Sequence, residues 1–594
     1  MASTIFLASA FLASLPFTVA TNIVQDREYW YEMGRAAVLR RAGGRAADGS
    51  RARNVVLLIG DGLGVTTNTA ARVYKGQRHG QPGEETSLAW DNFPALAMTK
   101  TYNLDAQIGE SSACATALLC GVKANFETVG LDINGKFSNC ASSFKARVDS
   151  LIDWAQHEGK ATGLVTNTRV THATPAAAYA HSASRYWEDD AKIPPLSRRS
   201  CKDIARQLVE DEPGRNINVI LGGGRRHWIS KVASHPEQEK EEGRRLDGRN
   251  LIEDWLRDKK RRGIRAQYVW NKELMDKVDP KSVDQLLGLF AYSHMDFEAD
   301  RDKSPKGDPS LAEMTKKALS ILQKNKKGFF LLVESGRIDH AHHYNNPYRA
   351  LDETLVLEEA LLAVLEAVDQ SETLIVVTSD HSHVLTMGGL ATPRGNPIFG
   401  TDTKLSDVDG LPYWTLLYGN GPGYTMPRAV PTNVSGSEKN AVHTSAVPRQ
   451  WATHGGEDVP VMAQGPLDMA LFSGTMDQTV VAHAIAYAAC LPPYSYRCQN
   501  STPAVSKPQM CIPDENSVTN VKGRPGRGGV VLASSVMSED TPSLQQTSSS
   551  STSSSDGDGG GGSGNNSNRS SSPMKISQYI PALIILMAAM AAVT

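Results

Sequence analysis

The chain has 594 residues, of which 40% are hydrophobic and 21% are charged, and its formal net charge is −2. This composition is typical of a globular protein with a sizeable core, and one large α/β unit can occupy most of such a length. A basic excess that could neutralise the phosphates of a nucleic acid is absent, so we expect no nucleic-acid binding.

The first segment of the chain has the features of a targeting signal. Residues 1–20 are apolar and end in the small residues Val19 and Ala20, although the usual positive charge at the start is missing. This pattern predicts a secretory signal peptide and therefore an oxidising compartment for the seven cysteines. The disulfides that we expect are Cys140 with Cys201 and Cys490 with Cys498, with Cys114 and Cys120 as buried thiols and Cys511 unassigned.

Short apolar runs alternate with helical patterns along the middle of the chain. Five runs are predicted to be buried strands, namely residues 54–59, 161–165, 218–221, 328–333 and 373–378. Between the last two, residues 350–368 carry leucines and valines at helical spacing. This alternation predicts an α/β fold with a large, mostly parallel sheet covered by helices on both faces. Residues 387–449, rich in Gly, Pro, Asn and Ser, are predicted to form a surface excursion.

Three of the predicted strands are followed directly by acidic residues, a residue type that can bind metal ions. Asp61 follows the first strand, Glu334 the fourth and Asp380 the fifth. Ligands of open α/β sheets bind where the strands end, so these positions are expected to lie together.

The candidate metal ligands form four clusters: Asp61; Glu334 with Asp339 and His343; Asp380 with His381 and His383; and His454. Asp339 and His343 are four residues apart, so on a helix they project from one face and can share a metal ion. Imidazole and carboxylate groups suit zinc, whereas carboxylates with hydroxyls suit magnesium. Two neighbouring metals can clamp an in-line phosphoryl displacement. A single metal ion and buried salt bridges are the alternatives.

A candidate nucleophile precedes a predicted helix. Ser111 and Ser112 stand before a run of Ala and Leu, where backbone N–H groups and the helix dipole favour an anion. A plain helix cap is the alternative for either serine. No Gly-x-Ser-x-Gly elbow surrounds them, and a nearby zinc ion would lower the serine pKa without a histidine base. Arg169 and Arg185 flank residues 171–175 and are candidate phosphate-binding cations.

The C-terminal segment has the composition of a stalk and an anchor signal. Residues 501–573 are rich in Ser and Gly and are predicted to be disordered, and residues 574–594 form an apolar tail. Small residues, a polar spacer and a hydrophobic tail predict a glycosylphosphatidylinositol (GPI) anchor attached near Ser563 to Ser567. A C-terminal membrane helix is the alternative. Asn433 and Asn500 stand in glycosylation sequons.

Taken together, the motifs resemble those of eukaryotic alkaline phosphatases over about residues 26–498. They include NVVLLIGDGLG, CGVKAN, NTRVTHATPAAAYAH, GFFLLVESGRIDHAHH, VTSDHSHV and THGGEDVPV, in this order. The resemblance implies an alkaline-phosphatase-like catalytic domain, placed at residues 21–500, with a crown-type insertion. It also implies a homodimer that hydrolyses phosphate monoesters at alkaline pH through a phosphoserine intermediate, releasing an alcohol and inorganic phosphate.

The resemblance further assigns roles to single residues, with two Zn²⁺ and one Mg²⁺ per subunit. It implies Ser111 as the nucleophile, with Asp61, Asp380 and His381 on one zinc ion, Asp339, His343 and His454 on the other, and Asp61, Thr174 and Glu334 on magnesium. His172 and His383 are expected to contact these ligands without necessarily binding a metal ion themselves, and Arg185 is expected to bind the phosphate oxygens.

Two departures from the family pattern stand out. Glu110 precedes the nucleophile where the family usually has Asp, which keeps the charge on a longer side chain. For the calcium site of vertebrate members, Asp308 and the Phe290 carbonyl fit and Glu237 is a further candidate, but Ala291 stands where a carboxylate is expected. That difference argues against a bound Ca²⁺.

Together these features predict an enzyme at the extracellular face of the plasma membrane that acts on small phosphomonoesters, with phosphoproteins left open as substrates. Three other functions remain open. The first is a phosphodiesterase or sulfatase of the same superfold, the second is a surface protein that binds without catalysis, and the third is a serine hydrolase without metal.

Overall fold

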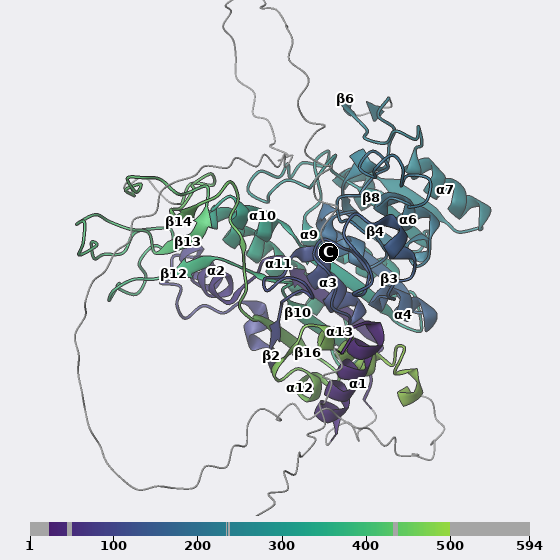
Figure 1. The fold of residues 1–594 in the computed structure, drawn as a ribbon, viewed down its shortest axis with the longest axis horizontal. Coiled ribbons are helices and arrows are strands. Elements are labelled where there is room, and N and C mark those ends of the chain that lie inside the picture. Colours follow the sequence, from purple (N-terminus) through teal and green to yellow (C-terminus); the bar gives the residue numbers. More distant parts are fainter. Residues whose placement is uncertain (1–22, 44–49, 233, 236–237, 432–436, 499–594) are drawn as a thin grey trace, which may run out of the picture. The chain divides into compact units, whose positions relative to one another are not determined.

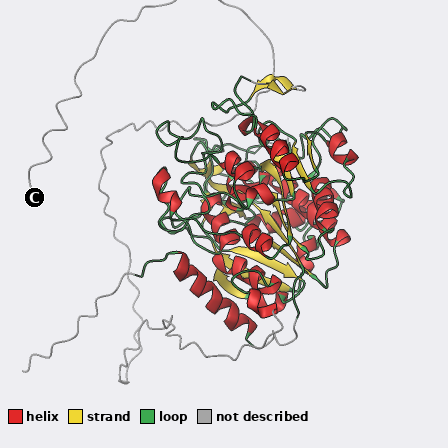
Figure 2. Ribbon diagram, turned by 90° about the vertical axis from the view of Figure 1, so that its right-hand side faces the viewer, coloured by secondary structure: helices red, strands yellow, loops and turns green. Residues whose placement is uncertain are grey.

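A ten-stranded β-sheet runs through the part of the chain that the structure describes, with helices on both of its faces (Figures 1 and 2). The computed structural model describes residues 23–43, 50–232, 234–235, 238–431 and 437–498. In order across the sheet, the strands are β17 (Gly474–Asp477), β2 (Ala95–Lys100), β16 (Val459–Gln464), β10 (Thr373–Thr378), β1 (Asn54–Gly60), β9 (Phe329–Ser335), β3 (Ala161–Arg169), β4 (Val219–Gly223), β8 (Gln285–Leu289) and β7 (Ala266–Val269). Only β16 runs antiparallel to its neighbours among these strands, so the predicted large, mostly parallel sheet is confirmed.

The central strands are apolar throughout because both faces of the sheet are covered. All seven residues of β1 are buried, and they alternate between two separate cores. Val55 and Leu57 pack into one core, whereas Val56 and Leu58 pack into the other. The five predicted strands correspond to β1, β3, β4, β9 and β10. The other five were not predicted, and β2 shows why, since its alternate side chains are exposed or half-buried.

Each core is closed by its own set of helices. One core packs against α1 (Arg27–Ala42), α3 (Ser111–Cys120), α4 (Leu151–His157), α5 (Ala173–Ala177), α6 (Ile204–Glu210), α7 (Leu251–Arg261) and α13 (Thr479–Ala489). The other packs against α2 (Val65–Arg78), α8 (Lys272–Lys277), α9 (Leu311–Leu322), α10 (Arg337–His343) and α11 (Pro347–Ala367). The helix predicted at residues 350–368 is α11, which begins earlier because the Asn346 side chain caps it and Pro347 fits its first turn.

The described residues of the segment 387–449 form mainly loops around a small sheet. Its strands are β12 (Leu385–Met387), β13 (Leu416–Gly421) and β14 (Ser445–Pro448), which Figure 1 places at one side of the molecule. The Tyr418 hydroxyl of β13 lies 2.9 Å from His342 Nδ1 of α10. The segment is therefore joined directly to the helix that carries Asp339 and His343.

Both expected disulfides are present, Cys140–Cys201 and Cys490–Cys498, and Cys114 and Cys120 are buried free thiols. None of the helices among the described residues is long and apolar enough to cross a membrane. Several predictions fall outside the described residues: the segments 1–20, 501–573 and 574–594, and the residues Glu237, Asn433, Asn500 and Cys511.

Candidate metal centre

The C-terminal ends of β1, β9 and β10 meet at one edge of the sheet. The register pairs Ile59 of β1 with Glu334 on one side and with Thr378 on the other, so all three strands end at the same level. Asp61 comes two residues after Ile59, and Asp380 comes two residues after its partner Thr378. The sheet thus collects the predicted carboxylates at its C-terminal edge, as expected for a ligand site of a parallel sheet.

The first group of ligands consists of Asp61, Asp380 and His381, all fully buried. Their ligand atoms lie within 4.8 Å of one another, and His381 Nε2 is 3.4 Å from Asp61 Oδ1 and 3.3 Å from Asp380 Oδ2. The Gly62 N–H donates to Asp380 Oδ1 at 3.1 Å, which fixes one oxygen of that carboxylate. Within the part of the chain that the structure describes, the buried oxygens Asp61 Oδ2 and Asp380 Oδ2 have no hydrogen-bond partner. Buried carboxylate oxygens without partners fit a bound cation.

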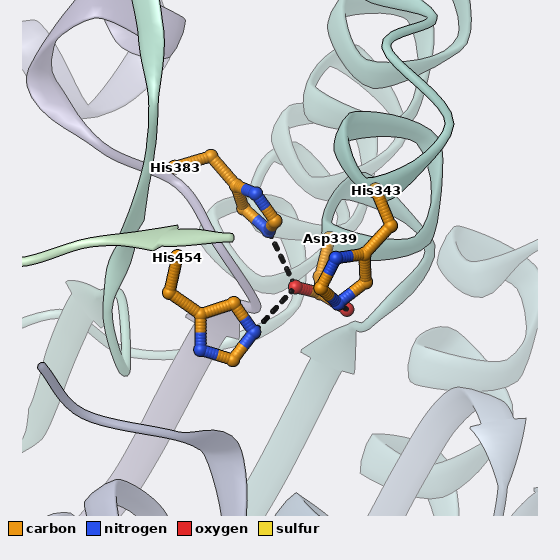
Figure 3. A group of neighbouring side chains, drawn as sticks. All are labelled: Asp339, His343, His383 and His454. Carbon is orange, nitrogen blue, oxygen red and sulfur yellow. Dashed lines mark hydrogen bonds and ion pairs between the residues drawn. The ribbon is translucent and has the colours of Figure 1, made fainter. Parts of the chain in front are cut away.

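The second group combines Asp339 and His343 of α10 with His383 of β11 (Ser382–His383) and His454 of β15 (His454–Gly455) (Figure 3). Asp339 lies at the centre, with His383 Nε2 at 2.5 Å, His343 Nε2 at 3.3 Å and His454 Nε2 at 3.5 Å. The pairing of β11 with β15 places His383 opposite His454, which brings both rings to α10.

Backbone carbonyls orient two of these imidazoles. His343 Nδ1 lies 2.7 Å from the Ala452 carbonyl, and His454 Nδ1 lies 2.8 Å from the Gly109 carbonyl. A carbonyl can only accept, so each Nδ1 carries a proton, and Nε2 is the ring atom left to face Asp339 or a metal ion. This is the arrangement that orients histidine ligands in metal sites.

The third group joins Asp61 to His172 and Glu334, with Thr174 buried nearby in α5. Thr166 and Thr168 of β3 donate to Glu334 Oε2, the second at 3.1 Å. Glu334 Oε1 and Thr174 Oγ1 have no hydrogen-bond partner in the described structure. A carboxylate and a hydroxyl oxygen without partners match the oxygen ligands that magnesium prefers.

The charge balance of the centre calls for cations. Burial and the neighbouring carboxylates raise the pKa of Asp61 well above its usual range. Burial raises the pKa of Asp380 to about 6 and that of Glu334 to about 7. Burial also opposes ionisation of Asp339, but His343 and His383 hold its pKa well below the usual value. Divalent cations would stabilise all of these carboxylates in their ionised form.

Ser111 is the first residue of α3 and faces the first group. Its hydroxyl lies 3.2 Å from His381 Nε2 and 3.5 Å from Asp61 Oδ1. Ser112 instead donates to Glu110 at 2.6 Å. The structure therefore distinguishes the two serines that the sequence left open, because only Ser111 contacts the metal-ligand group.

Glu110 links the nucleophile helix to Arg185. Its carboxylate caps α3 by accepting from the N–H groups of Ser112 and Ala113, both at 2.9 Å, and it also accepts from the Glu127 N–H. Arg185 Nη1 donates to Glu110 Oε2 at 2.7 Å. Burial opposes ionisation, yet Arg185 and these donors lower the Glu110 pKa below its usual value. Arg169, the other candidate, forms a two-pronged ion pair with Glu188 at 2.7 and 2.8 Å.

Some functional contacts could not be found from the sequence. His383 lies as close to Asp339 as the predicted ligands do, although it was expected only to support them. Thr166 and Thr168 hold Glu334 and were not singled out; their only signal is the alternation along β3, which turns both toward one face. His172 is placed near its expected position, with Nε2 at 3.3 Å from Arg185 Nη2.

The residues expected at a calcium site do not fit that ion. Arg225 donates to the Phe290 carbonyl at 2.8 Å, and Ala291 supplies no carboxylate. Asp308 lies in the same cavity, which Glu273, Asp296 and Asp302 line together with Arg225 and Lys306, and burial with Asp296 raises its pKa to about 6. A guanidinium on the carbonyl oxygen competes with a cation there.

Comparison with known proteins gives a consistent result. The model of the family described as alkaline phosphatase matches residues 52–491. The tissue-nonspecific alkaline phosphatase isozyme of Gallus gallus is 46% identical over 484 residues, which is 80% of this chain and 92% of that protein. The human isozyme is 44% identical over 82% of this chain and 93% of its own length.

A solved structure agrees on the fold. The alkaline phosphatase of Thermus thermophilus has a TM-score of 0.52 and 25% identity, covering 74% of this chain and 92% of that one. The alkaline phosphatase of the Antarctic bacterium TAB5, at 20% identity and a TM-score of 0.50, shares the fold over 74% of this chain and 99% of its own. With the metal-binding groups described above, these matches show that the chain belongs to the alkaline phosphatase family and is a hydrolase of phosphate monoesters.

Proposed function

We propose that the chain hydrolyses phosphate monoesters in two displacements, with Ser111 as the nucleophile and two Zn²⁺ and one Mg²⁺ as cofactors. The observation that carries this proposal is the position of Ser111 Oγ at the start of α3, within 3.5 Å of Asp61 and His381 and beside the Glu110–Arg185 pair. Asp61, Asp380 and His381 would hold one zinc ion, and Asp339, His343 and His454 the other. Asp61, Thr174 and Glu334 would hold magnesium.

When bound, these ions lower the pKa of the serine hydroxyl and of water and neutralise the charges that develop on oxygen. The chain's own residues supply the rest. In the first displacement the Ser111 oxygen attacks phosphorus, the ester P–O bond breaks, and the alcohol leaves with a proton. In the second, water attacks the phosphoserine, and inorganic phosphate leaves as the Ser111 hydroxyl is restored.

Arg185 is proposed to bind the non-bridging phosphate oxygens. Its Nη1 donates to Glu110, the residue before Ser111, and this bond fixes the orientation of the guanidinium. A planar guanidinium matches two phosphate oxygens, and a fixed one loses little side-chain entropy when the substrate binds. Glu110 is the positioning residue in this proposal, because it contacts both Arg185 and the N–H groups of α3.

The test is hydrolysis of p-nitrophenyl phosphate by the purified protein and by Ser111→Ala, each before and after chelation and after zinc and magnesium are restored. We expect the wild type to be active, to lose this activity on chelation and to regain it with metal, and we expect Ser111→Ala to be inactive throughout. Ser112→Ala is the matched control and should keep most of the activity. Loss in Ser112→Ala with full activity in Ser111→Ala would refute the assignment. Activity that survives chelation would indicate a serine hydrolase without metal.

We further propose that the enzyme is a homodimer at the extracellular face of the plasma membrane, held by a GPI anchor. The support is the pattern of residues 1–20, 501–573 and 574–594 together with the family resemblance. Release of activity from intact cells by a phosphatidylinositol-specific phospholipase C would support the anchor. Retention after that treatment, with release by detergent, would favour a membrane helix. Light scattering of the released protein would report the subunit number.

A further inference from the structure

The edge of the sheet opposite the metal centre carries a row of cationic side chains. Strands β1, β9, β3, β4, β8 and β7 are parallel neighbours in this order, so all six begin at the same edge. We call the cations at this edge the basic row: Arg51, Arg53, Lys160, Arg265, Lys324, Lys326 and Lys327.

Backbone carbonyls accept hydrogen bonds from three cations of the basic row near the strand starts. Lys160 Nζ donates to the carbonyls of Arg53 at 2.7 Å and Lys327 at 3.0 Å. Arg53 Nε donates to the Lys326 carbonyl at 3.1 Å. Further along, Lys324 Nζ donates to the carbonyls of Pro280 and Val283, just before β8. The row is therefore densest at the starts of β1, β9 and β3, and Lys324 extends it to the loop before β8.

Most of the charge in the basic row is left without an acidic partner. Glu372 pairs with Arg53 at 3.1 Å and Asp284 with Arg265 at 2.6 Å. Within the described part of the chain, no ion pair joins Arg51, Lys324, Lys326 or Lys327 to an acidic side chain, and all four are exposed.

The count of charges gives the same result. Four acids lie near the row, Glu372, Asp284, Glu158 and Asp279, so seven cations less four acids leave three positive charges, whereas the whole chain carries −2. Crowding of the cations is visible at Lys160, where burial and then Arg51, Arg53 and Lys327 lower the pKa to about 8. An anion bound at the row would relieve this repulsion.

We propose that the basic row binds a linear polyanion, of the class of the sulfated polysaccharides. Neighbouring strands lie about 4.8 Å apart, so the six strand starts span roughly 24 Å in a single line. A line of that length matches an extended chain with anionic groups at short intervals, whereas a lipid surface would contact a broader face. The row and the metal centre lie at opposite ends of strands about 20 Å long, so a bound polymer leaves the metal centre open.

Binding of the full chain to heparin, measured at several salt concentrations, tests this proposal. The row variant is Arg51→Gln/Lys326→Gln/Lys327→Gln, and the matched control is Lys136→Gln/Lys145→Gln/Arg147→Gln, three exposed cations away from the row. We expect the row variant to raise the Kd about tenfold or more and to reduce the slope of log Kd against log salt by about two to three. The control should change the Kd less than about twofold.

Phosphatase activity distinguishes this outcome from a folding defect and from a failure of the catalytic proposal, since the row variant should hydrolyse p-nitrophenyl phosphate at the wild-type rate. Equal loss of heparin binding in the two variants, or no heparin binding by the wild type, would overturn the proposal. So would binding to phosphatidylserine vesicles in the absence of heparin binding, which would assign the basic row to a membrane surface instead.

Discussion

The two edges of the same sheet carry charges of opposite sign in opposite surroundings. At the C-terminal edge Asp61, Glu334 and Asp380 are fully buried, and several of their oxygens have no hydrogen-bond partner among the described residues. At the N-terminal edge Lys326 and Lys327 are exposed, and water solvates their charges. One geometric rule, that parallel strands begin and end together, produces both clusters.

The difference in burial shows which of the two clusters needs a bound ligand for the protein to be stable. Removing a carboxylate from water costs several kcal/mol unless a counter-charge is present, so the C-terminal cluster is stable as anions only with cations bound. The basic row has no such requirement, because each side chain keeps contact with solvent. Cations at the acidic edge therefore contribute to the stability of the folded protein, whereas a ligand at the basic edge binds reversibly and more weakly as the salt concentration rises.

The largest expected effect comes from removing one charge at the acidic edge. Asp380→Asn should lower kcat/KM for p-nitrophenyl phosphate by about 10³ or more. The amide binds zinc poorly, and one negative charge is lost from the buried ligand group. Metal analysis should show less than the wild-type zinc content. The control is Asp284→Asn at the opposite edge, which breaks only the half-exposed pair with Arg265 and should change the rate less than about twofold. Full zinc content in Asp380→Asn would contradict the ligand assignment.

Much of this arrangement could be predicted from the sequence. Strands buried on both faces are continuous apolar runs, so β1, β9 and β10 were found together with the acids at their ends. The helical spacing of Asp339 and His343 also indicated a shared site, and their side chains lie 3.3 Å apart. These are local signals, each contained within about a dozen residues.

The rest depends on contacts between distant segments. His383 meets Asp339 because β11 pairs with β15, a pairing that no local pattern indicates. The role of Glu110 depends equally on Arg185, 75 residues away, whose guanidinium closes the set of donors around the carboxylate. From the sequence Glu110 was only a departure from the family; in the structure its longer side chain spans the helix cap and the arginine.

The next largest effect on kcat/KM is expected from a substitution of Glu110, an acid near the metal centre whose charge Arg185 already neutralises. Glu110→Gln keeps the shape but loses the ionic contact with Arg185 and turns a donor toward the N–H groups of α3. We expect kcat/KM to fall about 10- to 100-fold and the free energy of unfolding to fall by about 2 kcal/mol. Inhibition by inorganic phosphate should weaken in parallel, because Arg185 loses its orientation. Unchanged phosphate affinity would show that Glu110 only caps the helix.

A smaller effect should appear at Glu353 of α11, a buried acid of the same region that is not a proposed metal ligand. Burial raises its pKa from 4.5 to about 8, so the folded chain holds a proton that the unfolded chain releases. Its contribution to stability is complete below pH 4.5 and is lost as the pH rises to about 8, by up to about 5 kcal/mol. Bound metal should remove the corresponding pH dependence of stability at Glu334, a proposed ligand, but not the one at Glu353.

Glu353→Gln should therefore make the metal-loaded enzyme more stable at pH 9 relative to pH 6 than the wild type is. Denaturant unfolding at the two pH values measures this difference. Glu366→Gln, an exposed glutamate of the same helix, is the control and should leave the pH dependence unchanged. An identical pH dependence in Glu353→Gln and the wild type would show that Glu353 is ionised in the folded protein.

The smallest expected effect comes from the basic edge. Lys326→Gln/Lys327→Gln should change the free energy of unfolding by less than about 0.5 kcal/mol, because neither lysine has an acidic partner in the described structure and both are exposed to water. Any change should be toward higher stability at low salt, where repulsion from Lys160 and Arg53 is least screened, and should vanish at high salt. Urea unfolding at two salt concentrations measures both effects. A loss of more than 1 kcal/mol, or a change insensitive to salt, would mean that these cations stabilise the fold as the buried charges of the acidic edge do.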